Sequence, residues 1–141
     1  MDSTDLRLVA LLRENSRTPI SQLASLLGVS RGTVQNRIDR LVDDRVLLGF
    51  TVRTTPDVEP HRVRAITMIA VEGEKSAGVL KTLYGYPEVA DLHTTNGRWD
   101  IVAEIGTNSL EAFDEVLRRI RTIKGVSNSE SSLLLAAYKA R

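Results

Sequence analysis

Hydrophobic residues recur at helical spacing over the first third of the chain, up to about Thr54. Start and stop signals divide this stretch into three short predicted helices. The first helix begins after Asp2, with a second carboxylate three residues later at Asp5, and runs to Asn15. Its apolar face is made by three leucines: Leu8, Leu11 and Leu12.

Two further helices are predicted between Thr18 and the end of this stretch. Pro19 starts the second helix well, because proline in the first turn loses no hydrogen bond, and Gly28 ends it. Its buried face is predicted to be Leu23, Leu26 and Leu27. Ser30 caps the third helix, whose inward stripe is Val34, Ile38 and Leu41.

Beyond Val63 the pattern changes to strand-like stretches that alternate with helical ones. The order strand, helix, strand, strand, helix, strand is predicted over 63–72, 75–84, 89–95, 99–106, 110–123 and 126–138. Ser109 precedes the last helix, whose apolar side is Leu110, Phe113, Leu117 and Ile120, and Gly125 is expected to stop it. This βαββαβ order is typical of a ferredoxin-like antiparallel sheet with both helices on one face. The bare apolar face predicts pairing with a second copy of the chain.

Residues 20–41 combine three features of two helices that cross at a steep angle. Ala24 is small where the helices would touch, Gly28 can adopt a positive φ, and Val34 fills the corner. The combination is typical of a helix-turn-helix, whose second helix enters the major groove of DNA.

With its apolar stripe inward, the third helix turns Gly32, Asn36 and Arg40 toward solvent. Asparagine and glutamine bond the adenine edge, threonine meets the thymine methyl group, and arginine takes guanine or phosphate. Within the helix only Asp39 opposes the arginines, which favours phosphate binding. The candidate DNA contacts are Ser30, Arg31, Thr33, Gln35, Asn36, Arg37 and Arg40. The alternative is the ordinary polar exterior of a soluble helix; similarly, Gly32 indicates either a close backbone approach or a fraying first turn.

Composition excludes several chemistries. The 141 residues are 42% apolar and 26% charged, which fits one modest core or two small ones. A net charge of +1 means that any nucleic-acid patch is local. The absence of cysteine excludes a disulfide, a thiolate metal site and a cysteine nucleophile, and two histidines, His61 and His93, are too few for an imidazole zinc site. For the protein as a whole we expect no catalytic residue, metal or cofactor. The longest apolar run, 133–138, is too short for a membrane helix, so a cytoplasmic protein without a membrane partner is expected.

Seven segments together resemble the Lrp/AsnC (leucine-responsive, feast/famine) family of transcriptional regulators, over nearly the whole chain. In the first half they are DLRLVALL at 5–12, LASLLGVS at 23–30, VQNRIDRL at 34–41 and LGFT at 48–51, where an exit strand is expected. In the second half they are YPEV at 86–89, GRWDIV at 97–102 and IKGV at 123–126.

The resemblance implies dimers made through the βαββαβ domains, often assembled into octamers, that bind double-stranded DNA. It also implies a small-molecule effector, usually an amino acid, held between subunits near the loop that joins the middle strands. Carried over by position, the effector site is Thr95, Asn96, Gly97, Arg98, Asp100 and a hydroxyl pair, Ser131 and Ser132. A carboxylate suits the ligand's ammonium group, while backbone amides and hydroxyls suit its carboxylate.

The same loop also fits a plain β-hairpin with Asn96 and Gly97 at its tip. Trp99 is expected to pack in the sheet or at an interface, and His93 to be a core or interface histidine.

Two residues depart from the family's pattern. Arg45 stands where the family commonly has glycine, so the third helix ends without that residue or accepts strain of about 1 kcal/mol. Arg98 lies two residues from Asp100 and would neutralise it or select an effector with an acidic side chain.

We therefore expect an α+β protein with a winged-helix-like helix-turn-helix domain over 1–54, a hinge over 55–62 that contains two of the four prolines, and a ferredoxin-like effector and dimerisation domain over 63–141. The expected function is metabolite-responsive, sequence-specific transcriptional regulation. The alternative is an enzyme resembling the sirohaem decarboxylases, whose tetrapyrrole cleft would draw on His61, Arg62, Arg64, His93 and Arg98.

Overall fold

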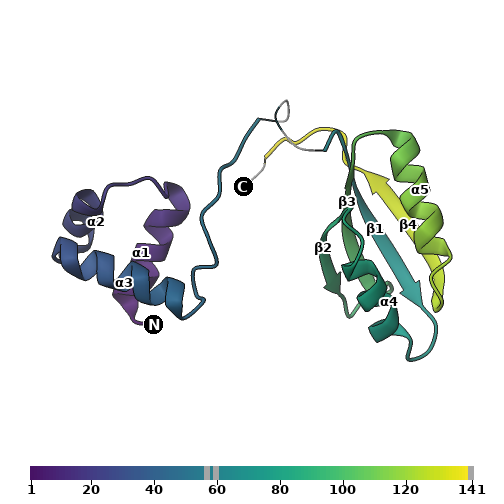
Figure 1. Ribbon diagram of the computed structural model, residues 1–141, viewed down its shortest axis with the longest axis horizontal. Helices are drawn as coiled ribbons and strands as arrows, with labels where there is room; N and C mark the ends of the chain where they lie inside the picture. Colours follow the sequence, from purple (N-terminus) through teal and green to yellow (C-terminus); the bar gives the residue numbers. More distant parts are fainter. Residues whose placement is uncertain (56–57, 59–60, 140–141) are drawn as a thin grey trace. The chain divides into compact units, whose positions relative to one another are not determined.

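A computed structural model describes residues 1–55, 58 and 61–139, and the chain divides into two compact units, Met1–Val52 and Arg53–Arg141 (Figure 1). Of the hinge expected over 55–62, residues 56, 57, 59 and 60 lie outside the described part. Each unit has a hydrophobic core of its own.

The first unit holds three helices: α1 (Ser3–Glu14), α2 (Ile20–Leu27) and α3 (Arg31–Asp43). The predicted caps are confirmed at Asp2 and Ser30, whose side chains accept hydrogen bonds from backbone amides three residues on. Gly28 takes the left-handed conformation, with φ +70°, and ends α2 as predicted. These local signals position the tight turn between α2 and α3.

Seven buried residues form the core of this unit: Leu8, Leu12, Leu23, Ala24, Leu27, Val34 and Leu41. The prediction that Leu26 is buried is wrong, because its side chain is half exposed. Helix α2 packs through its Ala24 side, where the missing bulk allows close approach, and Leu26 falls outside this contact. The backbone carbonyl of Leu26 instead accepts a hydrogen bond from Arg7 of α1.

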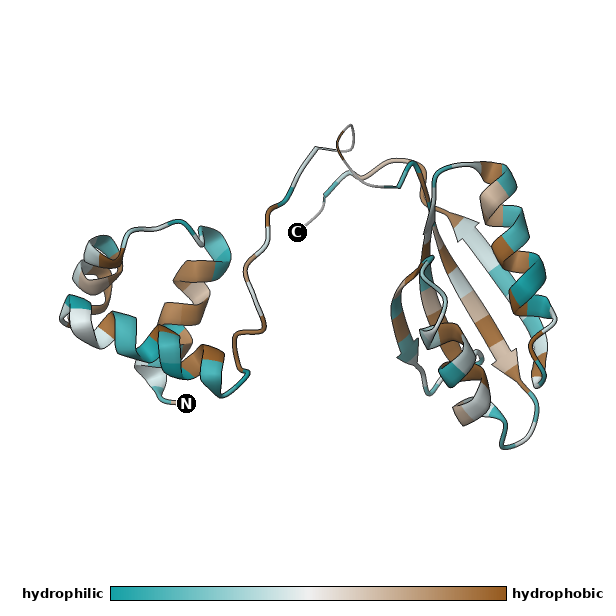
Figure 2. Ribbon diagram, in the orientation of Figure 1, coloured by the Kyte–Doolittle hydropathy of each residue, from teal (hydrophilic) through white to brown (hydrophobic). Residues whose placement is uncertain are grey.

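The chain leaves α3 through a strained residue. Arg45 adopts φ +56°, so the strain expected from the missing glycine is present. The exit strand expected over 48–51 is not formed, and among the described residues this unit contains no strand. A strand needs a backbone partner, which the rest of the unit does not supply. Leu48, Phe50 and Val52 are consequently exposed, and Figure 2 shows apolar residues in brown along the chain after α3.

The second unit is a four-stranded antiparallel sheet with two helices. Its strands are β1 (Val63–Val71), β2 (Val89–Thr94), β3 (Ile101–Thr107) and β4 (Val126–Leu133), in the order β2-β3-β1-β4. Helices α4 (Ser76–Tyr84) and α5 (Leu110–Arg121) complete the predicted ferredoxin-like order. The ends of these elements lie within two residues of the predicted ones, except for the end of β4. Strand β4 ends five residues before 138, and α5 ends at Arg121, because Thr122 caps it and Gly125 turns the chain into β4.

Both helices pack on one face of the sheet. The core lies between them and alternate residues of β1 and β3: Ala65, Ile69, Val79, Leu83, Ile101, Ala103, Ile105, Phe113, Val116, Leu117 and Ile120. Leu110 is exposed rather than part of the apolar side, since it lies in the first turn of α5. Ile66, Met68 and Val102 alternate with the core residues and are half-buried on the opposite, open face.

Neither histidine lies in the core. His93 is exposed on β2, so of the two expected places, core or interface, the core is wrong and the interface stays a prediction. The half-buried His61 packs on the backbone of Gly106, where a Cβ atom would lie 2.6 Å from its Cδ2 atom. Among the described residues no helix combines the length and apolar character needed to cross a membrane.

Candidate functional site

The outward face of α3 carries the predicted DNA contacts. Arg31, Gln35, Asn36 and Arg40 are exposed, and Thr33 is half-buried at the edge. Within the residues that the structure describes, Arg31 and Asn36 make no side-chain hydrogen bond or ion pair. An unengaged amide and guanidinium at the N-terminal half of this helix suit contact with base edges and phosphates.

Three other predicted contacts are engaged within the helix itself. The hydroxyls of Ser30 and Thr33 lie 2.9 Å apart and share a hydrogen bond, in addition to the backbone cap. Gln35 donates through Nε2 to the Asp39 carboxylate at 2.8 Å. These short-range bonds hold the polar side chains in defined orientations at the surface.

Arg37 and Arg40 are paired with acidic side chains of α1. Arg37 donates through Nη1 to Asp2 and Asp5, each at 2.8 Å at closest, and Arg40 donates through Nη2 to Asp5 at 2.9 Å. Asp39 is therefore not the only acid that opposes these arginines. The sequence predicted Asp2 and Asp5 only as helix-capping residues. The signal that was missed is the equal spacing: the two aspartates are three positions apart in the sequence, and so are the two arginines.

The pairing shifts the ionisation of the acids. The Asp5 backbone amide, followed by the Arg37 guanidinium, holds the pKa of Asp2 below its ordinary value. The Arg37 hydrogen bond also lowers the pKa of Asp5, against a smaller opposite effect of burial. The same contacts raise the pKa of Arg37. Asp2, Asp5 and Arg37 are thus charged at neutral pH.

The predicted effector loop lies between β2 and β3 and is closed by its own hydrogen bonds. Thr95 donates from its backbone amide to the Asp100 carbonyl and from its hydroxyl to the Trp99 carbonyl. Gly97 donates to the Thr95 hydroxyl, and its φ is not positive. Strands β2 and β3 pair antiparallel and form the expected β-hairpin, with Asn96 and Gly97 in its loop. The loop has six residues, so Gly97 does not need the positive φ of a primed two-residue turn.

Asp100 ties the loop to the end of strand β1 through its side chain. Its Oδ2 atom accepts a hydrogen bond from the Val71 backbone amide at 2.7 Å, at the end of β1. Arg98 does not pair with Asp100 among the described contacts; its guanidinium lies 5.8 Å from the Trp99 ring centre, in a cation–π arrangement. Asn96 is exposed at the loop surface.

Ser131 and Ser132 lie on β4, which β1 and β3 separate from the edge strand β2. The Ser131 hydroxyl is paired with the buried Thr67 hydroxyl at 2.8 Å, on the helix-covered face. Ser132 is exposed, and neighbouring strand residues point to opposite faces. One chain therefore does not bring both hydroxyls together with the loop.

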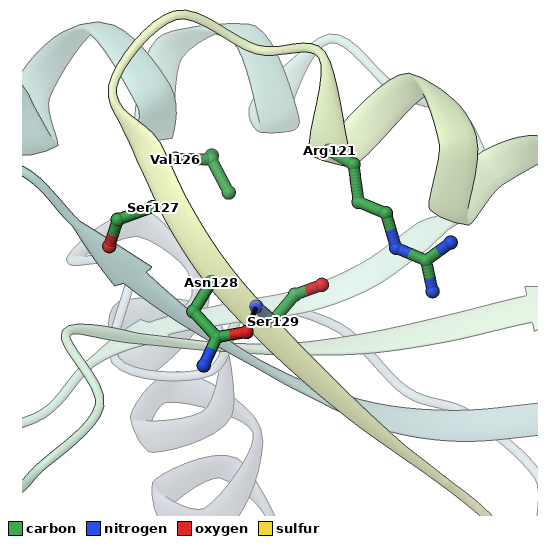
Figure 3. A pocket seen from close by; sticks show the side chains of 5 residues that line it. All are labelled: Arg121, Val126, Ser127, Asn128 and Ser129. Atoms are coloured by element: carbon green, nitrogen blue, oxygen red, sulfur yellow. Dashed lines mark hydrogen bonds between the residues drawn. The ribbon is translucent and has the colours of Figure 1, made fainter.

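A shallow pocket of about 190 Å³ lies where α5 is followed by β4 (Figure 3). It is lined by Arg121, Val126, Ser127, Asn128 and Ser129. Arg121 and Asn128 lie on opposite sides of the β4 ribbon in Figure 3, so their polar groups do not converge on one ligand position. The pocket contains none of the predicted effector residues.

Family comparison covers both units. Residues 1–42 match the AsnC-type helix-turn-helix domain, and residues 64–141 match the Lrp/AsnC ligand binding domain.

Curated relatives match along the whole chain. The HTH-type transcriptional regulator FL11 of Pyrococcus furiosus is 26% identical over 139 residues, which are 99% of this chain and 92% of that protein. The HTH-type transcriptional regulator Ptr1 of Methanocaldococcus jannaschii is 27% identical over 140 residues, covering 99% and 95%. These relatives are regulators, and the enzymatic alternative considered from the sequence is set aside.

Solved structures have the same fold. The leucine response regulatory protein LrpA of Mycobacterium tuberculosis is 27% identical, with a TM-score of 0.82 over 99% of this chain and 96% of that one. AsnC of E. coli has a TM-score of 0.86 at 24% identity, covering 100% and 96%, and shows the likeness of fold.

Proposed function

Because this chain belongs to the Lrp/AsnC family of transcriptional regulators, we propose that it recognises specific DNA sites through the outward face of α3 and responds to a small metabolite, an amino acid, bound by its C-terminal unit. The proposal rests on two polar side chains of α3 that are available to bind DNA. Arg31 and Asn36 are exposed, and neither makes a side-chain hydrogen bond within the described residues.

Each candidate residue of α3 receives a role from its chemistry. Asn36 reads a base edge, Gln35 and Thr33 flank it, and Arg31 binds phosphate beside the Ser30 cap. Arg40 contacts phosphate with the part of its guanidinium that Asp5 does not occupy. Arg37 is mostly committed to the two aspartates, and we assign it the weakest direct contribution.

For the effector we propose a site that is completed by a second copy of the chain. Asp100 uses Oδ2 for the Val71 amide and keeps Oδ1 for the ammonium group of an amino acid. The exposed Ser132, contributed by the other copy, suits the ligand carboxylate better than Ser131, whose hydroxyl is paired with Thr67. Thr95, Asn96, Gly97 and Arg98 shape the loop around the ligand.

We propose a homodimer through the open face of the sheet, with further association to an octamer. The half-buried Ile66, Met68 and Val102 support this proposal, since an apolar sheet face that no helix covers gains from a second copy. Two recognition helices would then meet one face of DNA about 34–36 Å apart, or a multiple of this distance. Binding to DNA fits the cytoplasmic location expected from the sequence.

The test is retention of genomic DNA fragments at two salt concentrations, with and without a pool of the twenty amino acids, followed by sequencing. We expect selective, salt-sensitive retention that changes with the pool of amino acids.

Asn36→Ala should relax base preference, whereas Arg31→Ala should weaken binding to all sequences and lower the salt slope by about 1. Arg13→Ala, an exposed arginine at the end of α1, is the matched control and should leave retention unchanged. Absence of retention at low salt would contradict the proposal.

A further inference from the structure

The cluster of Asp2, Asp5, Arg37 and Arg40 joins the start of α1 to the middle of α3. The Asp5 carboxylate accepts from the Asp2 backbone amide at 3.2 Å, from Arg37 at 2.8 Å and from Arg40 at 2.9 Å. The Asp2 carboxylate in turn accepts a hydrogen bond from the Asp5 backbone amide at 2.9 Å, and another from the Arg37 guanidinium. Asp5 is therefore the member that contacts all three others.

Burial explains why this carboxylate holds its partners firmly. The Asp5 side chain is only 1% exposed, and a buried carboxylate is tolerated when its oxygens are paired and hydrogen-bonded. Both oxygens of Asp5 are used by the contacts above. The orientation of α3 against α1 is consequently coupled to this one group.

The two arginines differ in what they leave available. The Arg37 side chain is 21% exposed, and its buried Nε atom has no hydrogen-bond partner among the described residues, so Arg37 belongs mainly to the interior of the unit. The Arg40 side chain is 55% exposed and donates to Asp5 only through Nη2 among the described contacts. A guanidinium has five N–H donors, so Arg40 can bind Asp5 and a second anion at once. Arg40 also lies four residues from Asn36, on the same side of the helix.

We propose that Asp5 is a positioning residue for DNA recognition. Its carboxylate binds one edge of the Arg40 guanidinium, so that the opposite edge of this group faces a DNA phosphate. The same carboxylate sets the rotation of α3 that presents Asn36 to the bases. The inference rests on the proposed DNA-binding face of α3. A long arginine side chain that is held in place loses less freedom on binding than a loose one, which favours the correct site over other sequences. Asp5 thus acts on specificity although it does not touch DNA.

The test is Asp5→Asn in the full chain, which keeps the size of the side chain and removes its charge. The probes are a duplex that the native protein enriches from a random-sequence pool and a scrambled duplex of the same composition, each titrated over a range of KCl concentrations. We expect the ratio of the two affinities to fall about tenfold, and the salt slope on the scrambled duplex to steepen by about 1, because one more cation becomes available.

The affinity ratio separates positioning from folding. A variant that is partly unfolded loses affinity for both duplexes by the same factor, so its ratio and its salt slopes stay at the native values. That result would overturn the inference. An equal gain of affinity for both duplexes would overturn it too, since Asp5 would then merely compete with DNA for Arg40.

Three further variants sharpen the result. Asp43→Asn removes an exposed acid from the end of α3 and is the control for net charge; it should leave the ratio of the two affinities unchanged.

Asp2→Asn retains a capping side chain, so it remains informative where Asp5→Asn fails to fold. It should lower the ratio of the two affinities less than Asp5→Asn does. Combining Asp5→Asn with Arg40→Ala should lower the ratio by less than the product of the single effects, because the two residues act together. Fully independent effects would contradict the route through Arg40.

The native protein separates this inference from the proposed function. Where the random pool yields no enriched duplex for the native chain, the proposed function fails and the inference fails with it. Where the native chain discriminates and Asp5→Asn discriminates equally well, only the inference fails.

Discussion

At the scale of single residues, the carboxylates of Asp2 and Asp5 have the clearest consequence for stability. Their pKa values lie below the ordinary value, mainly through the Asp5 backbone amide for Asp2 and the Arg37 guanidinium for Asp5. The folded state therefore favours their ionised forms. Their contribution is present above the ordinary pKa of an aspartate and is lost as the pH falls through the lower, folded-state values.

We accordingly expect the melting temperature of the first unit to fall as the pH is lowered from about 5 to about 3. Trp99 and all three tyrosines lie in the second unit, so tryptophan fluorescence reports that unit alone, whereas circular dichroism at 222 nm reports the helices of both. Asp2→Asn should weaken the acid dependence seen by circular dichroism without changing the fluorescence profile. Identical circular-dichroism profiles for the native and variant chains would contradict the assignment.

At the scale of elements, the tight turn and the first turn of α3 use glycine for different reasons. Gly28 takes a positive φ that ends α2. Gly32 has ordinary helical geometry, and an added Cβ atom would meet only the Ser30 hydroxyl, at 4.0 Å. The fold therefore does not require glycine at position 32, and a helix interior is weakened by it.

Gly32→Ala should raise the free energy of unfolding of the first unit by about 1 kcal/mol, since alanine is the better helix former. If the backbone of this turn approaches DNA closely, the same methyl group should weaken binding about tenfold. The measurements are urea unfolding and affinity for the enriched duplex. Gly78→Ala, in α4 and equally free of neighbours, is the control that should stabilise its helix and leave DNA affinity unchanged. Unchanged DNA affinity in Gly32→Ala would leave helix fraying as the explanation of this glycine.

At the scale of the whole molecule, two separate cores serve two tasks. The helical core supports α3, and the sheet core supports a layer whose second face is covered by neither α4 nor α5. That open face also carries the ion pair between Arg64 and Glu104, so its apolar area is bordered by charge. A mixed surface of this kind suits a specific contact between copies.

Met68→Lys should convert the proposed dimer into single chains, because it places a cation between the two sheets, where removing it from water is costly. Within one chain the new lysine faces Glu130 of β4, so the fold itself should persist. Sedimentation should show the mass of one chain, and DNA affinity should fall with the loss of bivalent binding. Tyr84→Lys, an exposed position at the end of α4, is the control that should retain the native mass. An unchanged mass for Met68→Lys would contradict the open face as the dimer surface.

Local chemistry made much of this protein predictable from its sequence. The caps at Asp2 and Ser30 and the turn at Gly28 are confirmed, because each depends on residues within a few positions of one another. The βαββαβ order is confirmed for a related reason, since the period of apolar residues is set within each element.

Only the tertiary structure decided which groups meet across long separations. Arg37 lies 32 residues from Asp5, and Ser131 lies 64 residues from Thr67, yet each pair shares a hydrogen bond. Such pairs depend on which helix faces and strand neighbours come together, and periodicity within one element does not contain that information. Leu26 shows the same limit, since three leucines fit the apolar face of α2 but the packing around Ala24 buries only two. The sequence thus predicts the elements and their order, while packing selects which of their polar groups are engaged and which remain available to a ligand.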